Sequence, residues 1–273
     1  MPEKKPWRLA EITLKDVRKA RFQAAVLPFG ATEPHNFHLP YATDNYEVAD
    51  ICDRACGWAW KKGARVALLP HIPFGSDNNM LNYPMTISLD QELLNAIVAA
   101  VARSLEHHGV LKLLIVNGHG GNNFQSGLRS LLGRTKVFCC LMNTWETMAD
   151  AGREIFENPG EHADEAETSM VQAIAPHLVD LPAALDGGIY PSCFEAGRKG
   201  WVWYPRPWDR LTKNSGNGDP RKATAAKGRK FLERSGERIG NFLVELSRAK
   251  MDAAFPFDHS KPAKPPKRIR AGD

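Results

Sequence analysis

Short apolar runs alternate with longer amphipathic stretches through the first half of the chain. The apolar runs predict four β-strands, at 23–27, 65–69, 111–116 and 136–142. The stretches between them have the helical spacing of apolar positions and predict helices at 45–62, 88–108 and 124–132. Ser88 and Gln91 have the spacing of a capping box at the start of the second helix. Strands that alternate with helices indicate a parallel sheet layered between helices.

The second half of the chain has a different pattern. An apolar helix is predicted near 170–175, and a long basic helix at 220–251 carries one apolar stripe. Residues 185–219, between them, are rich in glycine, proline and aromatic residues. Because so many aromatic residues argue against disorder, we expect a lid or a subunit contact there.

Composition restricts the class of protein. The chain has 273 residues, a net charge of +5, and no apolar run long enough to span a bilayer, so no membrane partner is expected. Its five cysteines lack a CxxC pair, which argues against a disulfide framework and predicts a reducing, cytoplasmic location. The basic, proline-rich tail at 252–273 is expected to be a solvated end, without a nucleic-acid partner.

Two carboxylates and two histidines lie between residues 33 and 44, directly after the first predicted strand. Glu33 and His35 alternate, so their side chains share one face of an extended segment. Asp44 can join them once the chain has turned at Pro40. We therefore expect this loop to supply half of a two-metal site, with a polar loop that only caps a strand as the alternative.

Other polar groups follow the remaining strands. His71 follows the second strand, His119 the third, and Trp145 with Glu146 the fourth. In a parallel sheet these loops leave at one edge, where open α/β folds bind ligands. His71 is expected to be an ordinary loop histidine. A further polar cluster at 161–169 contains acids that suit a helix start, but helix capping does not explain its histidine.

Three motifs together resemble those of the creatininase (creatinine amidohydrolase) family. The family's Glu-Gln-His-Gly-x-His-Leu-Pro, followed by Thr-Asp, is similar to the sequence at 33–40 and 43–44, with Pro34 and Asn36 as departures. Asn-Gly-His-Gly-Gly-Asn stands unbroken at 117–122. His-Ala-Gly-Glu-x-Glu-Thr-Ser matches 162–169, except that Asp164 replaces the glycine.

The resemblance covers roughly residues 7–251 and implies a single three-layer α/β/α domain with a mostly parallel sheet, interrupted by the excursion at 185–219. It also implies a binuclear site of zinc, manganese or iron. By position, one metal ion is held by Glu33, Asp44 and His119. The other is held by His35, Asp44 and a further acid.

The further acid is the point at which this chain departs from creatininase. Gly121 stands where creatininase has that acid, so another carboxylate must substitute; we favour Glu165, with Glu167 as the fallback. His162 matches the family's proposed proton-transfer histidine. Substrate contact or support of the site is expected at the following residues: His38, Gly120, Gly121, Trp145 and Glu167.

The resemblance implies an amidohydrolase that cleaves a C–N amide bond, cyclic amides included, of a small-molecule substrate. Hydroxide on the metals would be the nucleophile, and His162 would carry the proton to the leaving nitrogen. Family members are typically oligomers, some hexameric, which implies a homo-oligomer. Two alternatives stay open: an isomerase or lyase on the same metals, and a non-catalytic ligand-binding module that uses the glycine loop at 118–121.

Overall fold

A sheet of four parallel strands forms the centre of the fold. The computed structural model describes residues 4–158 and 160–262. The strands are β1 (Ala24–Phe29), β2 (Val66–Leu68), β3 (Lys112–Asn117) and β4 (Phe138–Asn143), in the order β2-β1-β3-β4. All three strand pairs are parallel, which confirms the predicted α/β class.

Helices connect and extend the strands. The longer ones are α1 (Leu14–Ala20), α2 (Thr43–Lys61), α3 (Gln91–His107), α4 (Gln125–Leu131), α6 (Ala149–Ile155), α7 (Glu165–Ile174) and α10 (Ala225–Arg248). Single-turn α-helices are α5 (Thr144–Thr147), α8 (Glu195–Arg198) and α9 (Trp208–Leu211). The 3-10 turns are η1 (Leu9–Glu11), η2 (Asn78–Met80), η3 (Pro176–Leu178), η4 (Leu181–Ala183) and η5 (Pro220–Lys222).

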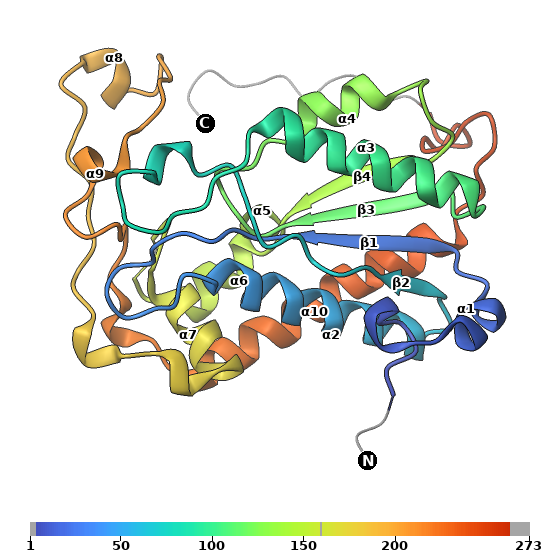
Figure 1. Ribbon diagram of the computed structural model, residues 1–273, viewed down its shortest axis with the longest axis horizontal. Helices are drawn as coiled ribbons and strands as arrows, with labels where there is room; N and C mark the ends of the chain where they lie inside the picture. The colour runs from blue at the N-terminus through green and yellow to red at the C-terminus, as the bar shows by residue number, and fades with distance from the viewer. Residues whose placement is uncertain (1–3, 159, 263–273) are drawn as a thin grey trace.

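Both faces of the sheet are covered, so the fold has three layers (Figure 1). Helices α3 and α4 lie on one face, while α2, α6, α7 and α10 lie on the other. Alternate residues of β1 face opposite cores: Ala24 and Val26 belong to the core with α2 and α10, whereas Ala25 and Leu27 belong to the core with α3. A strand that is buried on both faces needs a continuous apolar run, which is the pattern of β1 and β3.

The direction in which strands are added to the sheet reverses at its centre, between β1 and β3. The chain passes from β1 to β2 on one side, and then crosses back to place β3 on the other side of β1. The loops after β1 and β3 therefore diverge from the carboxyl ends of adjacent strands. At this point the Gly118 backbone N–H donates a 2.8 Å hydrogen bond to the Phe29 carbonyl. Open sheets bind ligands at such a point.

Two predicted helix starts differ from the structure. The prediction of a capping box at Ser88 and Gln91 is wrong. Helix α3 begins at Gln91, and the Ser88 hydroxyl instead donates to the Asn78 side-chain oxygen. Gln91 accepts a hydrogen bond from the Asn123 backbone. The last long helix begins at Ala225 rather than 220, because Thr224 caps it by accepting from the Lys227 backbone N–H.

The aromatic segment at 185–219 projects beyond the end of the sheet in Figure 1 and contains α8 and α9. Trp201 and Trp203 near its tip are exposed, whereas Trp208 is buried. The predicted basic tail lies largely outside the described residues, which end at 262. All five cysteines are free thiols. Among the described residues, no helix has both the length and the apolar character needed to cross a membrane.

Asp53, on α2, fastens the N-terminal segment to the body of the protein. Its carboxylate accepts hydrogen bonds from Lys5 Nζ (2.5 Å), Trp7 Nε1 (2.7 Å) and Arg8 Nε (2.6 Å). Burial by itself would raise the pKa of Asp53, but the three donors outweigh it and lower the pKa to about 2. The charged form is therefore the one that the fold stabilises.

We expect Asp53→Asn to lower the free energy of unfolding by about 1–2 kcal/mol at pH 7. Because the folded pKa lies below the unfolded value of about 3.9, the stabilisation is complete above pH 4 and is lost as the pH falls toward 2. Urea unfolding between pH 7 and pH 2.5 measures this. Asp50→Asn, on the same helix, is the control, and equal pH dependence in both variants would contradict the assignment.

Candidate metal centre

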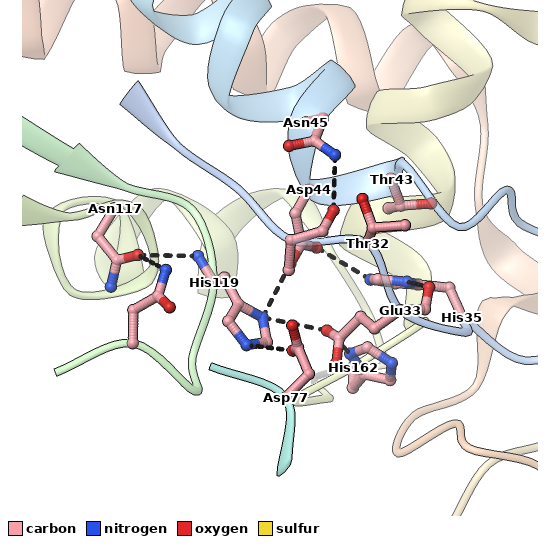
Figure 2. Close-up of polar contacts among 12 residues, drawn as sticks. Thr32, Glu33, His35, Thr43, Asp44, Asn45, Asp77, Asn117, His119 and His162 are labelled. Carbon is pink, nitrogen blue, oxygen red and sulfur yellow. Dashed lines mark hydrogen bonds and ion pairs between the residues drawn. The ribbon is translucent and has the colours of Figure 1, made fainter. Parts of the chain in front are cut away.

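Six buried acidic and histidine side chains, together with the partly buried Glu167, meet at the carboxyl edge of the sheet, and they come from four separate parts of the chain (Figure 2). The loop after β1 supplies Glu33 and His35, and the first turn of α2 supplies Asp44. Asp77 lies in the connection from β2 to α3, His119 directly follows β3, and His162 precedes α7. All six are buried. The fold thus gathers groups that are distant in sequence, as the order of the loops predicted.

Asp44 lies between two imidazole rings. Its Oδ1 is 2.9 Å from His35 Nε2, and its Oδ2 is 2.9 Å from His119 Nδ1. His119 Nδ1 is also 3.1 Å from Glu33 Oε1. The other nitrogen of His35 contacts the Glu33 backbone carbonyl at 3.1 Å, which fixes the orientation of that ring. Of the three residues predicted for the first metal ion, Glu33 and Asp44 therefore both contact His119 through its Nδ1.

The structure separates the two candidate acids of the third motif. Glu167 Oε2 lies 3.7 Å from His35 Nε2, and Glu167 joins His35 and Asp44 in a group whose ligand atoms lie within 4.8 Å of one another. Glu165 is fully buried elsewhere: it accepts from the Glu157 and Asn158 backbone N–H groups and pairs with Lys227. The geometry thus favours Glu167, the fallback of the sequence analysis, over Glu165.

Further residues of the motifs hold the cluster in place. His38 contacts Thr168 Oγ1 at 2.8 Å, which joins the first motif to α7. Asn36 has a positive φ of 59°, a conformation that asparagine tolerates, and its side chain donates to the Leu185 carbonyl. Asp164 caps α7 by accepting from the Ala166 and Glu167 backbone N–H groups. The departures from the family motif at these two positions therefore have local structural roles.

Burial has opposite effects on the acids and the histidines of the cluster. It raises the pKa of Glu33 to about 7 and that of Glu167 to about 8. Burial opposes protonation of His35, but the Asp44, Glu167 and Glu33 carboxylates outweigh it and raise the pKa of His35 to about 10. A cation between carboxylates that are buried this close together would stabilise their charged forms.

His162 is the exception among the histidines. Burial, and then repulsion from His35, lower the pKa of His162 well below its usual value. Its Nε2 lies 2.9 Å from the Pro34 carbonyl and its Nδ1 lies 3.7 Å from Glu33 Oε1. A neutral ring that donates from Nε2 to this carbonyl leaves the Nδ1 lone pair directed toward the cluster.

A cavity of about 800 Å³ opens from the cluster. Glu33, Asp44, His119, His162 and Glu167 border it at one end, together with the backbone of Gly120 and Gly121. Further along, the walls are mostly aromatic and apolar: Trp145, Met148, Phe156, Met170, Trp203, Tyr204, Trp208 and Phe231. The 185–219 segment thus supplies part of the cavity wall. His71 is exposed, as expected of a loop histidine.

The donor set fits divalent metal ions. Among the described residues, Glu33 Oε2, His119 Nε2 and both Asp77 carboxylate oxygens are buried without a hydrogen-bond partner. Carboxylate oxygens and imidazole nitrogens are ligands that suit zinc, manganese and iron(II). Sequence reasoning missed two buried acids here, Asp77 and Glu47, because no motif or periodic pattern distinguishes them from other loop and helix carboxylates.

Comparison with known proteins agrees with this geometry. Residues 10–243 match the family model described as creatinine amidohydrolase. The chain belongs to the creatininase family. Members of this family are metal-dependent hydrolases that act on C–N bonds, and the protein is an enzyme of this class.

The chain is 29% identical over 218 residues to the mycofactocin precursor peptide peptidase of Mycobacterium ulcerans, which covers 76% of this chain and 79% of that protein. It is 28% identical over 202 residues to the creatinine amidohydrolase of Pseudomonas putida, which covers 65% and 75% of the two chains. A solved structure of a proposed creatinine amidohydrolase from Bacteroides fragilis has a TM-score of 0.86 and 34% identity, and covers 92% of this chain and 100% of that one. These likenesses confirm the fold and the family.

Substitutions of the two neighbouring glutamates are expected to have different effects. Glu167→Gln should lower the metal content with little change in thermal stability, because it removes a carboxylate beside His35 and Asp44. Glu165→Gln should keep the metal and lower stability by about 1–3 kcal/mol, because it removes the charge that pairs with Lys227. Plasma mass spectrometry and thermal melts measure both properties. Loss of metal from the Glu165 variant alone would reverse the assignment.

Proposed function

We propose that this protein uses two divalent metal ions to hydrolyse a C–N amide bond of a small molecule. Glu33, Asp44 and His119 hold one ion, and His35, Asp44 and Glu167 hold the other, so that Asp44 bridges them. The observation that carries the proposal is the position of the Asp44 carboxylate, with one oxygen against each of the two histidines. A carboxylate placed in this way can bridge two ions about 3.5–4 Å apart.

Bound divalent ions would lower the pKa of water to near neutrality and polarise the carbonyl of the amide. The protein supplies the remaining groups. The backbone N–H groups of Gly120 and Gly121 border the cavity and donate no hydrogen bond to another described residue. They are therefore available to the oxygen of the substrate's carbonyl, where negative charge develops during hydrolysis.

His162 is proposed to move the proton that the leaving nitrogen requires. Its Nε2–H is held by the Pro34 carbonyl, so Nδ1 can accept a proton at the cluster and release it to the substrate. The Trp208 ring stands edge-on against His162, with the ring centroids 5.0 Å apart. The contacts with Pro34 and Trp208 therefore hold the His162 ring in one orientation.

The cavity supports a substrate with an apolar or aromatic part beside its amide group. Its volume of about 800 Å³ and its aromatic walls suit a ligand that extends well beyond the metal ions. The relatives include a peptidase of a peptide precursor and a creatinine amidohydrolase, so both short peptides and small cyclic amides belong in a substrate screen. One solved creatininase structure is described with manganese and one mutant creatininase as a Zn–Zn type, so both metals should be tested. A homo-oligomer and a cytoplasmic location stay predictions.

Metal content per chain is the first test of this proposal. We expect about two ions per chain in the wild type, and their loss in Asp44→Ala, which removes the bridging ligand. His119→Ala should lose at least the ion shared with Glu33. Hydrolysis of a library of amides, monitored by release of the amine, should be lost in the variants that lose the metal.

Asp50→Asn, on the outer part of the same helix, is the matched control and should keep both properties. Wild-type protein that takes up no zinc, manganese or iron on titration would overturn the proposal. Metal binding with conversion of substrate but no hydrolysis would indicate an isomerase or lyase instead.

His162→Asn should keep both metal ions and lower kcat by about 10²- to 10⁴-fold, because it removes the proton carrier but no proposed ligand. The decrease should be smallest for substrates whose leaving amine has a low pKa, since these need little protonation. Steady-state kinetics with a series of anilides measures it. An equal decrease across the series would argue against proton transfer by His162.

A further inference from the structure

Asp77 is a fully buried acid at the edge of the metal centre that no motif identified. Its backbone N–H is held by Ser88 Oγ at 2.8 Å, and its carbonyl accepts from the Met80 backbone N–H at 2.8 Å, which starts η2. These contacts fix the loop and direct the carboxylate toward His119. Burying a carboxylate is unfavourable unless a partner compensates for it, so this position requires an explanation.

The carboxylate lies against the outer nitrogen of His119. Asp77 Oδ1 is 2.7 Å from His119 Nε2, whereas His119 Nδ1 contacts Asp44 and Glu33 on the other side of the ring (Figure 2). The contact is short, yet His119 Nε2 and both Asp77 carboxylate oxygens have no hydrogen-bond partner among the described residues. Such contacts commonly become aligned when the site is occupied.

Gly121 makes room for this contact. A Cβ atom at position 121 would lie 2.3 Å from the Ser76 carbonyl oxygen and 2.4 Å from His119 Nε2. Any side chain there would therefore push the Ser76–Asp77 backbone away from the ring. The contact between Asp77 and His119 therefore depends on the absence of a side chain at position 121.

The two nitrogens of an imidazole have different roles when one of them binds a metal ion. A carboxylate that holds the proton on the outer nitrogen fixes the tautomer and keeps the inner lone pair free for the metal. His119 Nδ1 is the inner nitrogen here, since it faces the two carboxylates that would share the ion. Asp77 occupies the position of the outer partner.

We propose that Asp77 is a positioning residue that holds the Nε2–H tautomer and the orientation of His119, so that Nδ1 binds the metal ion shared with Glu33 and Asp44. This inference rests on the proposed metal site. It differs from direct ligation, in which Asp77, Glu33 and His119 would bind one ion together, a grouping that their ligand atoms also allow within 4.8 Å.

The test compares the affinity for Zn²⁺ of the wild type, Asp77→Asn and Asp77→Ala, measured by competition with a chromophoric chelator. Removal of an outer partner of a metal-bound histidine typically costs about 10–100-fold in metal affinity. We expect a decrease of that size in Asp77→Ala and a smaller one in Asp77→Asn, whose amide oxygen still accepts from Nε2–H. The number of ions bound at saturation should not change.

A second readout is the tautomer itself. In protein labelled with ¹⁵N-histidine and loaded with Zn²⁺, the long-range ¹H–¹⁵N spectrum should show His119 with Nε2 protonated in the wild type and a broadened or mixed signal in Asp77→Ala. Asp53→Asn changes another buried carboxylate far along α2 and is the matched control, with unchanged zinc affinity and His119 signal. Gly121→Ala should reproduce the loss of affinity, because it displaces the Asp77 loop.

The outcomes separate the two proposals. Unchanged zinc affinity in a folded Asp77→Ala protein would overturn the positioning role and leave the metal site intact. Loss of one bound ion in both Asp77 variants would make Asp77 a ligand instead. A wild type that binds no zinc, manganese or iron would overturn the metal site, and the role of Asp77 with it.

Discussion

The position of the Asp44 carboxylate between His35 and His119 determines how the other polar groups of the centre can be buried. Without those two rings, the buried carboxylates of Asp44 and Glu33 and the partly buried carboxylate of Glu167 would repel one another. Each ring contacts one oxygen of Asp44. The carboxylate at the start of α2 is thereby stabilised by His35 from the loop after β1 and by His119 from the end of β3. Glu33, Glu167 and Asp77 then take positions around these rings rather than around one another.

The fold holds these positions by close packing behind the centre. The end of β3 approaches α2 so closely that a Cβ at Gly118 would lie 2.9 Å from Val48 Cβ. On the other side, Glu165 pairs with Lys227 and thereby fastens the start of α7 to α10. Glu167 lies two residues further along the same helix and faces His35.

The aromatic segment at 185–219 is tied to the centre near its two ends in sequence. The Asn36 side chain contacts the Leu185 carbonyl, the Asn36 backbone donates to Ser215 Oγ, and His162 pairs with Asn217 through the backbone. Trp208 lies against His162, while Trp201 and Trp203 remain exposed. Residues of the three motifs therefore line the cavity at the cluster, and a segment outside the motifs supplies part of the rest of its wall.

The sequence by itself determined the order of strands and helices. Each element buries its own apolar face, so the spacing of apolar residues within that element is enough to reveal its type. The order of residues within the three motifs also predicted Glu33, His35, Asp44 and His119 as ligands, and the fold buries these four side chains close to one another. Only the tertiary structure separates Glu165 from Glu167: residues two apart on a helix point about 200° away from each other, and which face meets the centre depends on how α7 packs against α10. The position of Asp77 likewise depends on tertiary structure, since a loop carboxylate has no periodic pattern and only the fold brings it against His119.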